Sequence, residues 1–166
     1  MHSNLPAPQG LYDPRFEHDA CGVSFVANMK GVRSHDIVSK GLMALCNLEH
    51  RGATGAEETT GDGAGILIQV PDRFLRAVVP FELPAAGAYA VGMAFLPAAA
   101  GVTEKAQAAV EAIVAEEGLN PLGWRDVPIN PSILGATAVS VMPVFKEFFI
   151  SDPAGATGID LDRKVY

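Results

Sequence analysis

The stretch ACGVSFVA at residues 20–27 decides how the fold of this 166-residue sequence is read. Before it lies a leader interrupted by proline and glycine, so residues 1–20 are expected to be extended and to form no stable helix. After Cys21 come a glycine and then β-branched and aromatic residues, which predict a strand over residues 22–28. Cys21 therefore stands between an irregular leader and the first expected strand.

Cys21 is also a candidate catalytic residue. A cut between Ala20 and Cys21 would place a free α-amino group beside the thiol. An α-amino group has a reference pKa of about 7.7–8.0, so it can act as the neighbouring base that a cysteine nucleophile needs. The alternative is an ordinary buried thiol at the start of a strand, because free cysteine is among the most buried residue types.

Three segments carry a resemblance to a known family: residues 17–23 (EHDACGV), 48–56 (LEHRGATGA) and 60–71 (TGDGAGILIQVP). In this order and spacing they resemble the start of the class II glutamine amidotransferase domain in the large (alpha) subunit of glutamate synthases. Weaker matches extend the resemblance over nearly the whole chain, at residues 89–93, 122–128 and 163–164.

The resemblance implies a reaction and two site residues. Cys21 would be the N-terminal nucleophile that releases ammonia from glutamine, for glutamate synthesis from 2-oxoglutarate. Arg51 would lie near it and order the glutamine pocket. Residues 1–20 would be a leader or propeptide, and residues 21–166 the N-terminal part of the amidotransferase domain. The implied fold is α+β, a four-layer αββα sandwich of the N-terminal-nucleophile hydrolase type, incomplete at its C-terminal end.

The resemblance also sets what this segment is expected to lack. In the family an Asn-Gly pair supplies oxyanion donors, and no Asn-Gly follows Cys21 here. We therefore expect a fragment of a longer chain, inactive alone. No cofactor is expected in this segment, whereas the full-length family implies FMN and an iron–sulfur cluster. The implied partners are glutamine, the remainder of the large chain and a small electron-donating subunit.

Two other functions stay open. The chain could be a stand-alone binding domain without catalysis, or it could begin a different class II amidotransferase. The second is disfavoured because the insertion TGDGAG at residues 60–65 is a trait of the glutamate synthases that the chain resembles.

Composition narrows the class of protein. Hydrophobic residues make up 49% and charged residues 19%, as expected for a chain with a folded core. The net charge of −7, without a basic patch, argues against nucleic-acid binding. No apolar stretch is long enough for a membrane span, and no secretion signal is evident, so we expect a cytoplasmic protein. The cysteines and histidines are too scattered to predict a metal site.

Hydrophobic periodicity predicts the remaining elements. Helices are expected over residues 36–48, 72–79 and 103–117, and strands over residues 66–70, 89–96, 122–129 and 146–150. Residues 133–142 fit either a strand or a helix by pattern, and the resemblance makes them a helix. The absence of regular βαβ alternation favours an α+β fold. In the first helix, Cys46 is expected in the core, and Gly41 is expected to mark close packing.

Three smaller motifs each have a structural and a functional interpretation. The glycine-rich residues 61–65 follow a polar loop and lead into an expected strand, so they do not predict a phosphate-binding loop. His50 and Gly52 fit the end of a helix, and a structural role for His50 is favoured over a general base. His18 and Asp19 could assist cleavage before Cys21, or could belong to a propeptide in which they do nothing specific.

Overall fold

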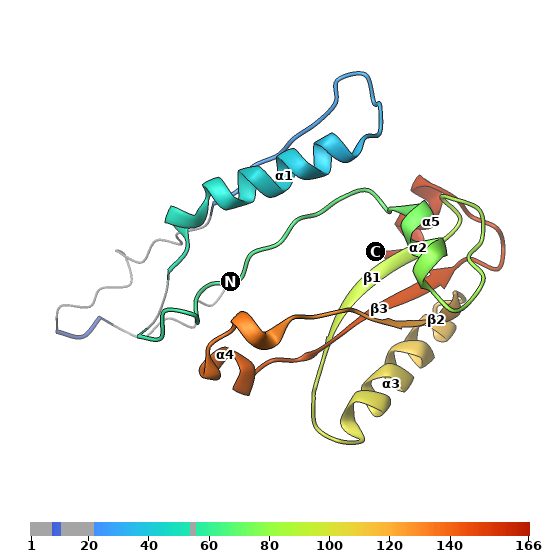
Figure 1. The fold of residues 1–166 in the computed structure, drawn as a ribbon. Helices are drawn as coiled ribbons and strands as arrows, with labels where there is room; N and C mark the ends of the chain where they lie inside the picture. The colour runs from blue at the N-terminus through green and yellow to red at the C-terminus, as the bar shows by residue number, and fades with distance from the viewer. Residues whose placement is uncertain (1–7, 11–21, 54–55) are drawn as a thin grey trace. The chain divides into compact units, whose positions relative to one another are not determined.

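A computed structural model describes residues 8–10, 22–53 and 56–166 of the chain (Figure 1). The chain divides into two compact units, residues 1–66 and 67–166. Cys21 and most of the predicted leader over residues 1–20 lie outside the described residues.

The first unit is built on one amphipathic helix, α1 (His35–Asn47), followed by the short 3₁₀ helix η2 (Glu49–Arg51). This confirms the helix predicted over residues 36–48. Asp36 lies in the first turn, where a negative charge suits the helix dipole, and it pairs with Lys40 at 2.7 Å. Ser34 holds the N-cap position, but its side chain makes no capping hydrogen bond.

Two expectations for α1 are wrong. Cys46 is exposed rather than in the core. It lies nine residues after half-buried Ile37, which is two and a half turns at about 3.6 residues per turn, so it points to the opposite side of the helix. Gly41 does not mark close packing either, because a Cβ added there would meet no atom within 4 Å.

Two predicted strands, residues 22–28 and 66–70, form no regular structure. A strand satisfies its backbone groups through a neighbouring strand, and no ladder involving either segment is present among the described residues. Val23 and Leu67 are accordingly 90% and 101% exposed. The turn between the first segment and α1 does form, because the Gly31 N–H donates to the Asn28 carbonyl at 2.9 Å and Gly31 adopts φ +67°.

The second unit contains a three-stranded antiparallel sheet in the order β1-β3-β2. The strands are β1 (Ala90–Leu96), β2 (Asn120–Asp126) and β3 (Val144–Ser151). All three were predicted, although β2 begins two residues early and β3 is longer than expected. Pro121 is tolerated because β2 is an edge strand, and the register shifts between Pro121 and Gly123.

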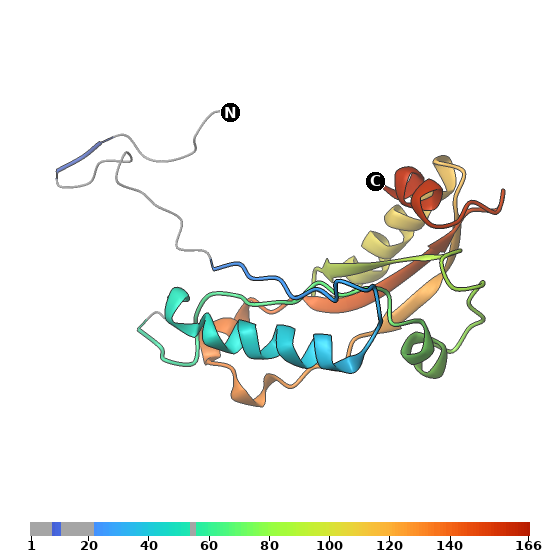
Figure 2. The same ribbon diagram turned by 90° about the horizontal axis from the view of Figure 1, so that it is seen from above.

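The side chains of β3 alternate between the two faces of the sheet. Phe149 is fully buried on one face with Leu75 of α2 (Asp72–Val78). Phe148 and Ile150 are buried on the other face, beside α3 (Val102–Glu116). Figure 2 shows α2 and α3 on opposite sides of the sheet. Both helices were predicted, and their packing on one antiparallel sheet is compatible with the α+β class.

Helix α2 packs on the sheet through Leu75, which is 2% exposed, whereas Phe74 and Val78 on the same helix are exposed. Asp72 accepts a hydrogen bond from the Tyr89 hydroxyl at 3.0 Å. Burial, and then this hydrogen bond, raises the pKa of Tyr89 to about 12.

The C-terminal part of the second unit adds short helices. Residues 133–142 include the helix α4 (Ala136–Ser140), preceded by η3 (Pro131–Ile133), so the helical alternative is confirmed. Helix α5 (Ile159–Val165) was not predicted. It is anchored by Leu161, which is 1% exposed, and by a 2.6 Å ion pair between Lys164 and Asp152.

We predict that Phe149→Ala lowers the free energy of unfolding by about 3–5 kcal/mol, because it empties the centre of a core. Urea unfolding, followed by the fluorescence of Trp124, measures the change. Trp124 is suited to this because it stacks on Phe148 with ring centroids 4.3 Å apart. Phe95→Ala, at a side chain that is 66% exposed, serves as the control and should cost less than about 1 kcal/mol. Equal losses would contradict the assignment of this core.

A second prediction concerns acid stability. The hydrogen bond from Lys164, then those from the N–H groups of Ala154 and Ala156, lowers the pKa of Asp152 despite its burial. The ionised Asp152 carboxylate therefore stabilises the folded protein fully above its unfolded-state pKa of about 3.9. This stabilisation is lost as the pH falls through the folded-state pKa. We expect the unfolding free energy to decline less below about pH 4 in Asp152→Asn than in the unchanged protein.

The exposed Asp160 provides the control for this measurement. Urea unfolding at a series of pH values should show an unchanged acid profile for Asp160→Asn. An Asp152→Asn protein that keeps the original acid profile would contradict the assigned role of Asp152.

Candidate active site

Arg51 is the predicted site residue that the structure describes. It ends η2, directly after α1, and its backbone N–H donates to the Leu48 carbonyl at 2.8 Å. The next residue closes the turn, because the Gly52 N–H donates to the Glu49 carbonyl at 3.0 Å. Arg51 is exposed, and its guanidinium makes no ion pair within the part of the chain that the structure describes.

Gly22 lies against the stem of Arg51. A Cβ added to Gly22 would be 3.2 Å from both Cβ and Cγ of Arg51 and 3.1 Å from a methyl group of Leu48. These separations are shorter than ordinary van der Waals contacts, so only a glycine fits without displacing a neighbour. Gly22 is the residue that follows Cys21 in the sequence. The structure thus places the neighbour of the predicted nucleophile in the chain against Arg51.

Asp62 ties the end of the following loop back to its start. Its carboxylate accepts a hydrogen bond from the Ala53 N–H at 2.9 Å, and its own N–H donates to the Ala53 carbonyl at 2.9 Å. Within the loop, the Thr60 N–H donates to the Glu57 carbonyl at 3.0 Å. The glycine-rich residues 61–65 neither follow a strand nor open a helix, which agrees with the rejection of a phosphate loop.

The histidine of the same motif has a local contact. His50 Nδ1 lies 3.0 Å from the Asn47 carbonyl oxygen at the end of α1, so an N–H there can donate to it. This contact fits the structural role that was favoured for His50. Cys21, His18 and Asp19 lie outside the described residues, so their roles stay predictions.

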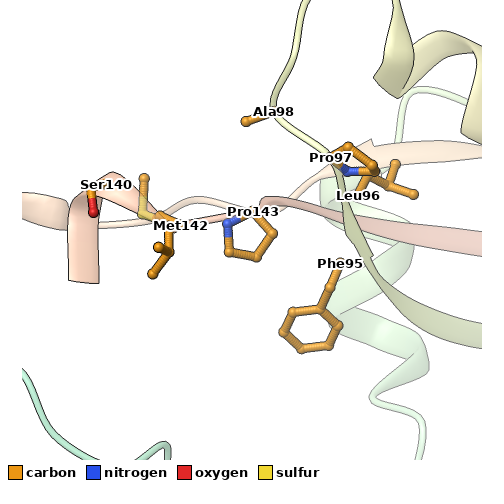
Figure 3. Close-up of a pocket in the computed structure, with 8 residues that line it drawn as sticks. Phe95, Leu96, Pro97, Ala98, Ser140, Met142 and Pro143 are labelled. Carbon is orange, nitrogen blue, oxygen red and sulfur yellow. The ribbon is translucent and has the colours of Figure 1, made fainter. Parts of the chain in front are cut away.

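A separate hollow of about 390 Å³ lies in the second unit (Figure 3). It is formed where the end of β1 meets the segment between α4 and β3, and it is lined by Phe95, Leu96, Pro97, Ala98, Ser140, Val141, Met142 and Pro143. The Ser140 hydroxyl donates to the Thr137 carbonyl at 2.7 Å, and no titratable side chain lines the hollow. The residues that line the hollow therefore include no base that could activate the Ser140 hydroxyl.

Across residues 8–10, 22–53 and 56–166, no group of three or more His, Cys, Asp or Glu side chains could hold a metal ion. These residues therefore do not fit the iron–sulfur cluster implied for the full-length family, whose ligands are cysteine thiolates.

In the same part of the chain, no helix combines the length and apolar character that crossing a membrane requires.

Comparison with known families decides the assignment. The model of the class II glutamine amidotransferases matches residues 21–166, and the match begins at Cys21. The chain belongs to this family. The predicted resemblance is therefore confirmed, and the family is one of enzymes.

Individual class II amidotransferases extend this result. The chain is 40% identical to the NADPH glutamate synthase large chain of Bacillus subtilis over 99% of its own length and 11% of that protein. It is 39% identical to ferredoxin-dependent glutamate synthase 2 of Synechocystis over 90% of its length and 10% of that protein. It is 43% identical to the NADH glutamate synthase of Schizosaccharomyces pombe over 84% of its length and 7% of that protein. The chain thus spans about a tenth of the length of these relatives.

Two features of the candidate site were not predicted from the sequence. It did not show that Gly22 packs on Arg51, or that Asp62 holds Ala53. The glycine directly after the candidate nucleophile was a usable signal for the first feature. For the second, the only signal was an aspartate between two glycines, a pattern that also suits an ordinary turn.

We predict that Gly22→Val lowers the free energy of unfolding of the first unit by about 1–3 kcal/mol, because its branched side chain displaces Leu48 and Arg51. Gly22→Ala should cost less, because alanine restricts the unfolded chain and recovers about 0.4–1 kcal/mol. Urea unfolding followed by far-UV circular dichroism measures both changes.

Gly41→Ala is the matched control for this prediction. A Cβ at Gly41 meets no atom within 4 Å, so this change should stabilise α1 by about 1 kcal/mol. If Gly22→Val proved as stable as Gly41→Ala, the contact between Gly22 and Arg51 would not exist in solution.

Proposed function

We propose that this chain carries the first part of the glutaminase site of a glutamate synthase large chain, with Cys21 as the N-terminal nucleophile. In this proposal residues 1–20 are removed as a leader, and residues 21–166 begin the amidotransferase domain. The observation that carries it is the family match, which starts at residue 21. The contact between Gly22 and the stem of Arg51 adds support, because Gly22 directly follows Cys21 in the sequence.

The proposed chemistry begins at the new N-terminus. The α-amino group of Cys21 accepts the thiol proton, and the thiolate attacks the side-chain amide carbon of glutamine. The tetrahedral intermediate collapses, and the amino group returns the proton to the departing ammonia. Water then hydrolyses the γ-glutamyl thioester to glutamate and regenerates the thiol. Each step uses the nucleophile and base that one N-terminal cysteine provides.

Arg51 has a supporting role in this proposal. A guanidinium binds carboxylates through paired, charge-assisted hydrogen bonds, and glutamine carries such a carboxylate. The stem of Arg51 is fixed against Gly22 while its charged end has no ion-pair partner among the described residues. We propose that Arg51 orders the glutamine pocket beside Cys21.

The role of the whole protein follows from its relatives. We propose that the ammonia passes to 2-oxoglutarate for glutamate synthesis, in the cytoplasm, within a longer chain that completes a four-layer αββα sandwich. FMN and an iron–sulfur cluster, held outside this segment, would supply the reducing chemistry. A small electron-donating subunit is a further proposed partner.

We predict that the isolated 166-residue chain, even when cut to expose Cys21, releases no ammonia from glutamine above background. No Asn-Gly pair follows Cys21, and losing a single oxyanion donor typically costs about 10²–10³ in rate. The full-length protein should release ammonia, and Cys21→Ser in it should reduce turnover by orders of magnitude because a hydroxyl is a poorer nucleophile than a thiol.

Cys46→Ser in the full-length protein is the matched control, since this exposed thiol has no assigned role and its loss should leave turnover unchanged. Robust, Cys21-dependent ammonia release from the short chain alone would show that the active site is complete without further residues. A full-length Cys21→Ser protein with normal turnover would refute the proposed nucleophile. A full-length protein that releases no ammonia at all would favour a binding domain.

A further inference from the structure

The aspartate of the TGDGAG segment has a specific contact that the proposed reaction does not use. Asp62 holds Ala53 through two reciprocal hydrogen bonds, one from the Ala53 N–H to the carboxylate and one from the Asp62 N–H to the Ala53 carbonyl, each 2.9 Å long. This tie joins positions nine residues apart. It closes the loop that begins after η2.

The position of the tie matters because Ala53 lies two residues after Arg51. Arg51 ends η2, a single 3₁₀ turn of three residues, and such a turn has few hydrogen bonds to keep its direction. Upstream, the Arg51 N–H donates to the Leu48 carbonyl at 2.8 Å. Downstream, Asp62 holds both backbone groups of Ala53. Arg51 is therefore fixed from both sides while its stem rests on Gly22.

We infer that Asp62 is a positioning residue, which fixes the backbone at Ala53 and thereby holds Arg51 beside the residue that follows Cys21. This inference rests on the proposed function, because it assigns Asp62 a role in that reaction. Asp62 does not touch the glutamine in this account. Its action is geometric, through the acceptor that its side chain offers to the Ala53 N–H.

Two substitutions in the full-length protein separate geometry from charge. Asp62→Asn removes the charge but keeps an oxygen that can accept from the Ala53 N–H, so kcat/KM for glutamine should stay within about threefold of the unchanged protein. Asp62→Glu keeps the charge but moves the carboxylate by one methylene, so kcat/KM should fall about ten- to a hundredfold, mainly through KM. The kcat/KM of Asp62→Ala should fall at least as far.

The controls use residues of the same unit. Glu58→Ala removes an exposed carboxylate from the same loop and should leave kcat/KM unchanged. In an Arg51→Ala protein, adding Asp62→Ala should lower kcat/KM by less than about threefold further, because Asp62 acts only by positioning Arg51. Alkylation of Cys21 by iodoacetamide, followed by mass spectrometry, should proceed in Asp62→Glu as in the unchanged protein, which shows that the nucleophile is intact.

The outcomes distinguish this inference from the proposed function. If the unchanged protein shows no Cys21-dependent ammonia release, the proposed function fails. If that release is present but Asp62→Ala is as active as the unchanged protein, only the positioning role fails. A larger loss in Asp62→Asn than in Asp62→Glu, or full additivity with Arg51→Ala, would also overturn it. Because Asp62→Asn and Asp62→Glu suffice for the comparison, the test does not depend on the folding of Asp62→Ala.

Discussion

The second unit depends on β3, because this one strand supplies both the hydrogen-bonded centre of the sheet and the middle of both cores. Its backbone pairs with β1 on one side and β2 on the other. Phe149 points into one core while Phe148 and Ile150 point into the other. The packing reaches the neighbouring strand, where the Phe81 ring occupies the space above Gly123, 2.7 Å from where a Cβ would be, and Gly123 itself adopts φ +149°. A side chain at Gly123 would meet both steric and backbone strain.

The elements that sequence reasoning predicted best are those whose signal is local. Helices α1 and α3 have long apolar periods, and strands β1 and β3 have β-branched and aromatic residues between turn signals. Residues 22–28 and 66–70 carry the same strand signal but find no partner among the described residues, since pairing is a long-range property that composition does not encode. Helix α5 was missed because it is short and rich in charge, and its anchors, Leu161 and the pair between Lys164 and Asp152, are tertiary.

The candidate site also has one part that the sequence predicts and one part that it does not. Arg51 could be proposed from its motif, and the structure places it against Gly22, the neighbour of Cys21 in the chain. The tie between Asp62 and Ala53 could not be predicted, because it joins exposed residues across a loop with no hydrophobic period. Family membership is shown over residues 21–166, and the chemical role of these contacts is the proposal made above.

The uncovered apolar segments bear on how this chain behaves among other copies of itself. Phe25 is 92% exposed and Leu67 101% exposed, within stretches of high strand propensity, VSFVA and ILIQV. Neither stretch contains a charge or a proline to discourage strand pairing between molecules. Segments of this kind promote aggregation when they are exposed, and charged residues beside such segments usually oppose it. The resistance of this chain to aggregation therefore depends on what covers these two stretches.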